Sequence, residues 1–253
     1  MPGFAELEFD LPGALLTAIL ERLEGMDAAD LTTANALTIP EEQGVYALYL
    51  KADNRLVYIG KTDSDAGLRH RLTRHARKIV GRRNIDPNDV AFKAIRLFVF
   101  TAMDLEAALI QHFGGVGAVA WNNSGFGSND PGRKRDTSDY KADHFDAQYP
   151  IELDEEFVAF EPGDYPVAEI MQRLKDGLPY TLRFQRPGRK SYHADFTNTV
   201  VTIAQPGMTA REVLALCGRN LPAGWHITAL PSHIISYKGD RNVYDHGHEI
   251  ART

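Results

Sequence analysis

Two tyrosines in the first quarter of the chain lie in short glycine-containing motifs. Tyr46 ends Gly44-Val45-Tyr46, Tyr58 opens Tyr58-Ile59-Gly60, and eleven residues separate the two tyrosines. A free phenol has a pKa of about 10, so it acts as a base at neutral pH only with help from neighbouring groups. Whether this pair does chemistry therefore depends on the residues that follow it.

A dense run of positive charge comes after the second motif. Between Gly67 and Arg83 the chain carries seven arginines and lysines and no acidic residue, although its formal net charge is −6. A positive block in an acidic protein indicates a polyanion partner, and an ordinary solvated basic face is the plainer alternative. Within the block, His75 lies one helical turn beyond Arg71, at the edge of an apolar stripe.

Glu106 is the carboxylate with the most unusual expected surroundings. Its neighbours on a helical wheel are apolar: Ala102, Met103, Leu109, Ile110 and Phe113. Burying an unpaired carboxylate is costly, so Glu106 would need a metal ion, a cation or a proton. A core glutamate that pairs with a nearby arginine is the alternative.

The elements that must position these groups follow from the residue pattern. Residues 44–50 and 55–60 are β-type runs, and Lys51-Ala52-Asp53-Asn54 between them predicts a hairpin turn, because Asp and Asn tolerate turn dihedrals. Helical spacing of apolar residues predicts a helix over 67–80. The hairpin would bring both tyrosines onto one small sheet, with the basic helix next in the chain.

The following elements carry the carboxylate and a loop. A third strand is expected over 94–100, and Thr101 can cap the Glu106 helix, with Asp104 three residues on. Residues 120–133 are rich in Gly, Asn and Pro and predict a loop near the site. The loop leads to Arg133-Lys134-Arg135, a second basic cluster suited to phosphates or an ordinary exposed loop charge.

The order of these features resembles the GIY-YIG nuclease family, which is named for the two tyrosine motifs. The resemblance covers roughly residues 40–150, and the wording Trp121-Asn122, Gly125-Phe126-Gly127 and Asp130-Pro131-Gly132-Arg133 is most similar to the Eco29kI-like type II restriction endonucleases within that family. It implies an α+β fold whose core is a small three-stranded antiparallel sheet flanked by helices. A few additional residues around 63–66 lengthen one loop relative to the family pattern.

The resemblance also implies a set of catalytic residues. These are Tyr46, Tyr58, Arg71, His75, Glu106 and Asn122. Glu106 would be the single metal ligand and would hold one Mg²⁺ per active site. Arg71 would stabilise charge on the phosphate, with Arg69 as the alternative for this position.

The remaining roles concern the attacking water. Tyr46 would be the general base or would orient the water, with help from His75 or Lys61. Tyr58 would position the phosphate or the water. Asn122, chosen over Asn123, would brace the site.

The expected activity is Mg²⁺-dependent hydrolysis of phosphodiester bonds in double-stranded DNA by a site-specific type II restriction enzyme. Cutting both strands of a short palindrome predicts a homodimer, and a DNA methyltransferase acting on the same site is the expected companion. Phosphate contacts are expected from Lys61, Arg69, Arg74, Lys78, Arg82, Arg133, Lys134 and Arg135. The alternatives are a DNA-repair or mobile-element nuclease with a C-terminal targeting module, and a catalytically inactive DNA-binding protein.

Composition sets the broad class of the protein. The chain has 253 residues, of which 43% are hydrophobic and 25% charged, as in ordinary globular proteins. Its one cysteine, Cys217, excludes an intrachain disulfide and a cysteine-based zinc site, which fits the reducing cytoplasm. No signal peptide and no membrane-length apolar run is visible, so we expect a cytoplasmic enzyme.

The chain is expected to divide into three parts. Residues 1–40 form an N-terminal extension whose helix, over 12–25, covers the sheet or makes a dimer contact. Residues 41–155 form the nuclease domain, and residues 156–253 form a C-terminal α+β domain of unknown role. The C-terminal residues 245–248 are expected to be a mobile tail.

Local patterns in the C-terminal part predict its elements. A helix is expected over 167–174, after a turn at 162–164, and Thr209 to Glu212 is a capping box for a second helix. Strands are expected over 180–184, 199–203, 225–230 and 233–237. Residues 185–190 are a basic hairpin tip, which is either a surface turn or a DNA contact.

Overall fold

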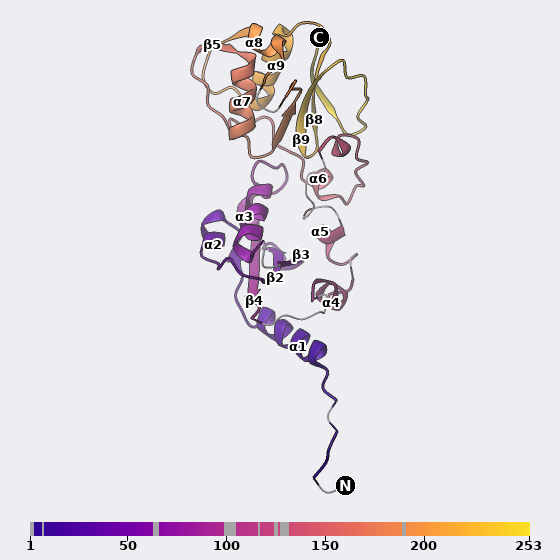
Figure 1. The fold of residues 1–253 in the computed structure, drawn as a ribbon. Helices are drawn as coiled ribbons and strands as arrows, with labels where there is room; N and C mark the ends of the chain where they lie inside the picture. The colour runs from indigo at the N-terminus through magenta and orange to yellow at the C-terminus, as the bar shows by residue number, and fades with distance from the viewer. Residues whose placement is uncertain are drawn as a thin grey trace. The chain divides into compact units, whose positions relative to one another are not determined.

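The computed structural model describes residues 3–6, 8–62, 66–98, 105–115, 117–123, 126, 132–188 and 191–253. The fold is α+β, as predicted, and helices and strands are interspersed along the whole chain (Figure 1). Backbone contacts separate two compact units. The first unit comprises residues 1–77 and 86–127, and the second comprises residues 78–85 and 128–253.

These units differ from the expected parts 1–40, 41–155 and 156–253. Residues 128–155 belong to the second unit, because Ile151 and Leu153 are buried in its hydrophobic core. Residues 1–40 belong to the first unit, because Ile19 and Leu23 are buried in the cluster that holds Val45. The boundary expected near residue 155 therefore lies at 127–128.

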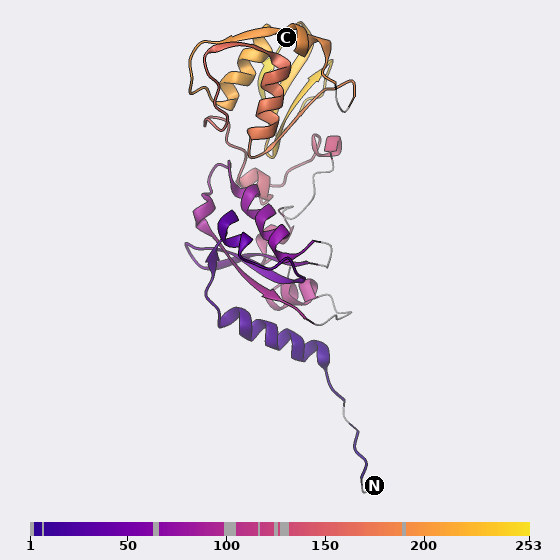
Figure 2. The same cartoon turned by 60° about the vertical axis from the view of Figure 1, so that its left-hand side comes forward.

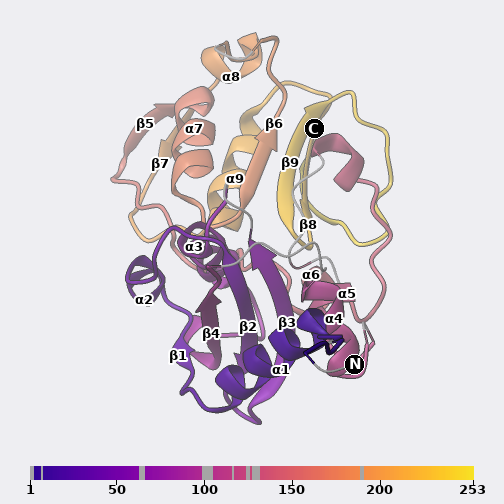
Figure 3. The same ribbon diagram turned by 60° about the horizontal axis from the view of Figure 1, so that its bottom comes forward.

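The first unit contains a four-stranded antiparallel sheet of order β1-β4-β2-β3. The central strands are β2 (Gly44–Leu50) and β4 (Val90–Arg96), and the edges are β3 (Arg55–Thr62) and the two-residue β1 (Ala29–Asp30). Figure 3 shows β4, β2 and β3 side by side. The expected three strands are present, but the third begins at Val90 instead of residue 94, directly after the short 3-10 helix η1 (Pro87–Asp89).

The β2–β3 hairpin is the local structure predicted from the turn residues. Asn54 adopts a positive φ of 52°, which Asn tolerates better than most residues. The Asp53 carboxylate accepts a hydrogen bond from the Arg55 backbone N–H at 3.1 Å. A register shift between Leu48 and Tyr49 adds one residue to β3 and increases the local twist.

Helices cover the two faces of this sheet. On one face, α1 (Leu11–Glu24) and α4 (Leu105–His112) pack against Val45 and Ile59, so the N-terminal helix covers the sheet as expected. Figure 2 shows α1 as the indigo helix beside the sheet. The opposite face receives α3 (Leu68–Ile79). The short helices α2 (Thr33–Leu37) and α5 (Ala120–Asn123) complete the described part of this unit.

The second unit has its own sheet, of order β10-β8-β9-β6. Its strands are β6 (Thr181–Phe184), β8 (Trp225–Leu230), β9 (His233–Lys238) and β10 (His248–Arg252). The pair β6–β9 is parallel, and the other pairs are antiparallel. A separate two-stranded sheet joins β5 (Gly163–Pro166) to β7 (Val200–Ile203).

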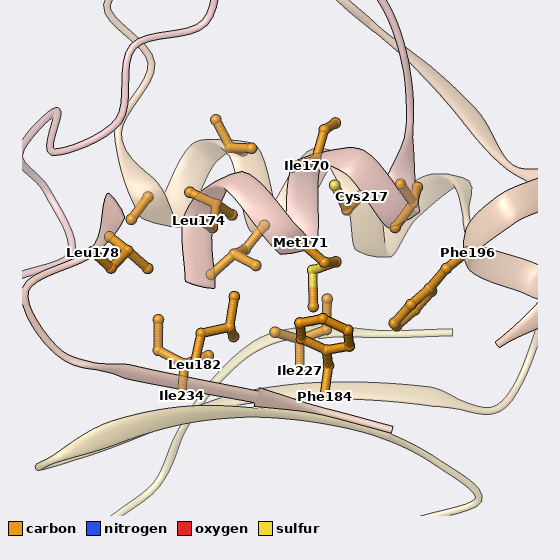
Figure 4. Packing of buried hydrophobic residues seen from close by; sticks show 14 of the residues in the cluster. Ile170, Met171, Leu174, Leu178, Leu182, Phe184, Phe196, Cys217, Ile227 and Ile234 are labelled. Carbon is orange, nitrogen blue, oxygen red and sulfur yellow. The ribbon is translucent and has the colours of Figure 1, made fainter. Parts of the chain in front are cut away.

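Two amphipathic helices form the core of the second unit with this sheet. In Figure 4, Met171 of α7 (Val167–Gly177) points toward Phe184 of the sheet, and Ile170, Leu174 and Leu182 are buried in the same cluster. Cys217 of α9 (Ala210–Asn220) is buried in the same cluster and is a packing residue. The remaining helices are α6 (Phe145–Gln148), α8 (Ala194–Asn198) and the 3-10 helix η2 (Gly132–Arg135).

Most of the elements predicted for the C-terminal part are confirmed. The capping box is present, because the Thr209 hydroxyl accepts from the Glu212 N–H and the Glu212 carboxylate accepts from the Thr209 N–H. Residues 245–248 are not a chain end without structure, because His248 begins β10 (His248–Arg252), which pairs with β8. The turn expected at 162–164 is wrong at Gly163 and Asp164, which begin β5.

Every helix within the described parts of the chain is too short or too polar to cross a membrane.

Candidate functional site

The register of the β2–β3 hairpin places both tyrosines on one face of the first unit's sheet. Tyr46 lies opposite Gly60, and Tyr58 lies opposite Leu48, so the tyrosines are diagonal neighbours with ring centroids 5.9 Å apart. A Cβ atom at position 60 would lie 2.4 Å from the Tyr46 ring and hydroxyl. Glycine is required there because the Tyr46 ring crosses the backbone of β3.

The α3 helix brings a histidine to Tyr46. Its residues Leu68, Leu72 and Ala76 are buried, which fixes the face that it turns to the sheet. The Tyr46 hydroxyl lies 2.8 Å from Nε2 of His75, and both side chains are buried. The Tyr58 ring lies beside both groups, with its centroid 5.9 Å from that of Tyr46 and 5.1 Å from that of His75. Three titratable groups thus lie together, with Tyr58 next to the pair that Tyr46 and His75 form.

An aromatic residue that sequence reasoning assigned no role holds the imidazole in place. The Phe126 ring stacks on His75 with centroids 4.8 Å apart and planes 15° apart, and Trp121 packs against Phe126 at 4.7 Å. Phe126 also contacts the Tyr58 ring edge-on at 5.5 Å. In the sequence, Phe126 is an aromatic residue within a glycine-rich loop. Such a loop has no periodic pattern from which the position of the ring could be predicted.

The electrostatics keep both phenols protonated. Burial raises the pKa of Tyr46 far above its ordinary value, and Tyr58 raises it further, whereas Arg71 lowers it. Burial also raises the pKa of Tyr58, with Glu106 adding to the shift, while Arg71 and Arg74 lower it. Neither tyrosine is therefore a base on its own at neutral pH.

Glu106 and Asn122 occupy the outer edge of β3. Because β3 ends the sheet, alternate backbone groups point away from β2 and need other partners. The Asn122 amide accepts from the Ile59 N–H at 2.8 Å and donates to the Ile59 carbonyl at 2.7 Å. Two residues on, the Lys61 N–H donates to Oε2 of Glu106 at 3.2 Å.

Glu106 is half-buried, in contrast to the full burial expected of it. Leu105 and Leu109 on either side enter the apolar cluster, while the carboxylate reaches the polar edge of β3. The expected cap Thr101 and the wheel neighbours Ala102 and Met103 lie outside the described residues. The carboxylate still acts on the site, because it raises the pKa of both tyrosines.

The two candidate arginines of α3 point to different surroundings. Arg69 donates through Nε to the Ile39 carbonyl at 2.7 Å and lies 3.9 Å from the Glu41 carboxylate. Arg71 is half-buried and lowers the pKa of both Tyr46 and Tyr58. The geometry therefore favours Arg71 over Arg69. Of the two asparagines, Asn122 contacts the site strand.

Two of the expected phosphate contacts lack the exposed charge that such contacts require. In the second unit, the Arg82 side chain is 5% exposed and donates to Oδ1 of Asp146 at 2.8 Å. The Arg135 side chain is 11% exposed and pairs with the other oxygen of the same carboxylate. Burial would raise the pKa of Asp146, but Arg82, Lys78 and Arg135 together hold it below its ordinary value.

The other expected phosphate contacts divide between the units. Lys61 is exposed and Arg74 is half-buried, both in the first unit. In the second unit, the Lys78 ammonium lies 5.5 Å from the Phe145 ring centroid, and the Arg133 guanidinium lies 4.4 Å from that of Tyr237. Lys134 is exposed.

The donor set near the tyrosines suits a metal ion that brings most of its own ligands. No group of three or more His, Cys, Asp or Glu residues that could hold a metal occurs in the described ranges. Glu106 supplies one carboxylate beside the two phenols. Mg²⁺ commonly uses one or two protein carboxylates and completes its shell with waters and substrate phosphate oxygens. Glu106 can supply the one carboxylate that such an Mg²⁺ ion needs. A site in which the protein provides all the ligands would need more carboxylates than Glu106 alone.

No protein-family model matches this chain, and no curated protein matches it either.

Proposed function

We propose that the first unit is an Mg²⁺-dependent nuclease of the GIY-YIG type that hydrolyses phosphodiester bonds in double-stranded DNA. The observation that carries the proposal is the 2.8 Å contact between Tyr46 and His75 beside Tyr58. Arg71 and Glu106 lie close enough to shift the pKa of both tyrosines. A cation, a carboxylate and a linked proton path together suit the hydrolysis of a phosphodiester.

The proton path runs inward from the half-buried phenol. As a water oxygen bonds to phosphorus, the water gives a proton to the Tyr58 oxygen, and Tyr58 gives its own proton to Tyr46. Tyr46 passes its proton to Nε2 of His75, which becomes an imidazolium, while the bond from phosphorus to the leaving oxygen breaks. Neither tyrosine has to ionise before the reaction, which agrees with their raised pKa values.

The other residues stabilise charge and hold geometry. The Arg71 guanidinium balances the charge that grows on the phosphate oxygens. Glu106 would hold the Mg²⁺, which when bound neutralises phosphate charge and stabilises the leaving oxygen. Asn122 is a positioning residue, because its amide fixes the Ile59 backbone next to Tyr58.

The biological class that we propose is a cytoplasmic, site-specific type II restriction enzyme. Cleavage of both strands of a palindrome requires two active sites, which a homodimer provides. A DNA methyltransferase acting on the same site would protect the host DNA. A repair or mobile-element nuclease would instead cut without a fixed palindrome, so the sequences of the product ends distinguish the two classes.

Cleavage of mapped plasmid DNA with Mg²⁺, followed by sequencing of the ends, tests this function. We expect the wild type to cut and Glu106→Gln to bind DNA without cutting, because only the metal-binding charge is lost. Glu21→Gln, an exposed change on α1, is the matched control and should cut normally. Cutting by Glu106→Gln at the wild-type rate, or no cutting by the wild type, would contradict the proposal.

A further inference from the structure

A groove runs along α3 in the first unit. Its α3 wall is formed by Arg69, His70, Thr73, Arg74 and Arg77, and it has a volume of about 360 Å³. These positions repeat at helical spacing, so they share one face of the helix. At 1.5 Å per residue, the wall is about 12 Å long from the first arginine to the last.

The groove is positively charged in a protein whose net charge is −6. Three arginines face one acidic residue, Glu41, and the opposite wall also contains Leu37, whose side chain is exposed. Arg69 is held by the Ile39 carbonyl at 2.7 Å, so its charge is fixed in place. Arg77 is exposed on the surface of the helix.

The groove and the candidate active site share helix α3. Arg74 lines the groove, the next residue, His75, contacts Tyr46, and the charge of Arg74 also lowers the pKa of Tyr58. The charges of a DNA strand recur about every 3.4 Å along the duplex axis, so a wall of about 12 Å spans more than one phosphate. A strand whose scissile phosphate lies at Tyr58 could therefore continue past Arg74 toward Arg77.

We propose that this groove binds the phosphodiester backbone of the DNA strand next to the scissile phosphate. The proposal rests on the nuclease function proposed above, and it names the surface that holds the substrate outside the reacting group. By contrast, a smaller hollow of about 130 Å³ in the second unit is lined by Asp136, Asp139 and Asp245. A phosphate would be repelled there.

Binding measurements in the full-length Glu106→Gln protein test the groove without cleavage. Arg77→Ala should reduce the slope of log affinity against log salt by about 0.9, the value for one lost contact to duplex DNA. Arg77→Glu should weaken binding by about tenfold or more, because it adds repulsion to the lost contact. Arg22→Glu, the same charge change on exposed α1, should leave affinity within about twofold, since it lies outside the groove.

Three outcomes separate this proposal from the nuclease function. If Arg77→Ala keeps the wild-type affinity and salt slope while the wild type cuts DNA, the groove assignment is wrong and the nuclease stands. If Arg77→Glu loses DNA binding but the wild type never cuts, the groove stands and the nuclease is wrong. If the protein does not bind DNA, both are rejected. Equal melting temperatures of the variants establish that each is folded.

Discussion

Each unit of the molecule contains a buried histidine within a polar network, and the two networks differ in what they can do. In the first unit, His75 contacts Tyr46 through Nε2. In the second unit, His233 lies 2.7 Å from the Ser232 hydroxyl and 2.8 Å from the Asp136 carboxylate. Judged by residue types alone, the second network is the more suggestive, because serine, histidine and aspartate are the members of a hydrolytic triad.

The hydrogen bonds show why the second network is structural. With the Nε2–H of His233 donating to Asp136, Nδ1 accepts from Ser232. The Ser232 oxygen then accepts from Arg135 Nε at 3.0 Å and from the Tyr140 hydroxyl at 3.1 Å. A hydroxyl has one donor and two acceptor positions, so Ser232 has no capacity left for a substrate.

Both histidines are buried, but solvent reaches the first network and does not reach the second. Tyr58 and Arg71 are half-buried, so one side of the network meets solvent, whereas Ser232 and Asp136 are both buried. The comparison teaches that suitable residue types form a functional site only where a substrate can reach the reactive atom. A buried network whose hydrogen-bonding positions are all filled stabilises the fold instead.

The largest expected effect is on the rate in the first network. His75→Ala removes the final proton acceptor, so single-turnover cleavage should fall by about 10²–10⁴-fold, the usual contribution of general acid–base catalysis. DNA affinity should change little, since His75 is buried beneath Tyr58 and makes no phosphate contact in the proposed site. His112→Ala, an exposed change on α4, is the control. Unchanged cleavage by His75→Ala would show that the network around His75 is not catalytic.

The next largest effect is on stability in the second unit. Asp146→Ala leaves two buried guanidinium groups without their carboxylate, which should lower the free energy of unfolding by about 3–5 kcal/mol. Chemical denaturation of the full chain measures this loss. Asp164→Ala, an exposed change on β5, should cost far less. Equal losses in the two variants would show that the buried pairs are not structural.

A smaller effect tests the triad-like serine directly. Ser232→Ala removes the shared partner of Arg135, Tyr140 and His233, and it should lower the free energy of unfolding by about 1–3 kcal/mol. Cleavage of DNA by the folded variant should equal that of the wild type. If Ser232→Ala instead loses an esterase or nuclease activity that the wild type has, the structural assignment is wrong.

The smallest effect is a difference in acid sensitivity. The pKa of Asp146 is lower in the folded protein than in the unfolded chain, so the unfolded state binds more protons near pH 4. This contribution to stability is complete above the ordinary aspartate pKa of about 3.9 and is lost as the pH falls through the lower folded-state pKa. Wild type should therefore lose more stability in that window than Asp146→Asn does. Parallel pH profiles would contradict this.

Local patterns predicted the elements that depend on local physics. Residues close together in the sequence determine three of these features: the Asp53-Asn54 turn, the apolar stripe of α3 and the Thr209 capping box. The expected help of His75 or Lys61 to Tyr46 came from the family resemblance and not from spacing, and in the structure the Tyr46 hydroxyl lies 2.8 Å from Nε2 of His75.

Elements fixed by distant partners were not predictable. Residues 245–248 were expected to be a mobile tail, but His248 begins β10, and that strand is held by its pairing with β8. Arg82 was expected to contact phosphate, but its partner Asp146 lies 64 residues away in the chain. The stacking of Phe126 on His75 likewise depends on the path of a loop. A sequence shows charge and apolarity, but it does not show which charges a fold will bury together.

The amide of Asn122 has a consequence for how copies of this protein could associate. An exposed edge strand is a template for a strand of another molecule, and joined sheets or aggregates can result. At β3, Asn122 takes both backbone groups of Ile59, and Glu106 takes the N–H of Lys61. A neighbouring molecule would have to break these bonds before it could extend the sheet. Asn122 and Glu106 therefore also hinder the pairing of β3 with a strand of another molecule. A homodimer would have to form through other surfaces.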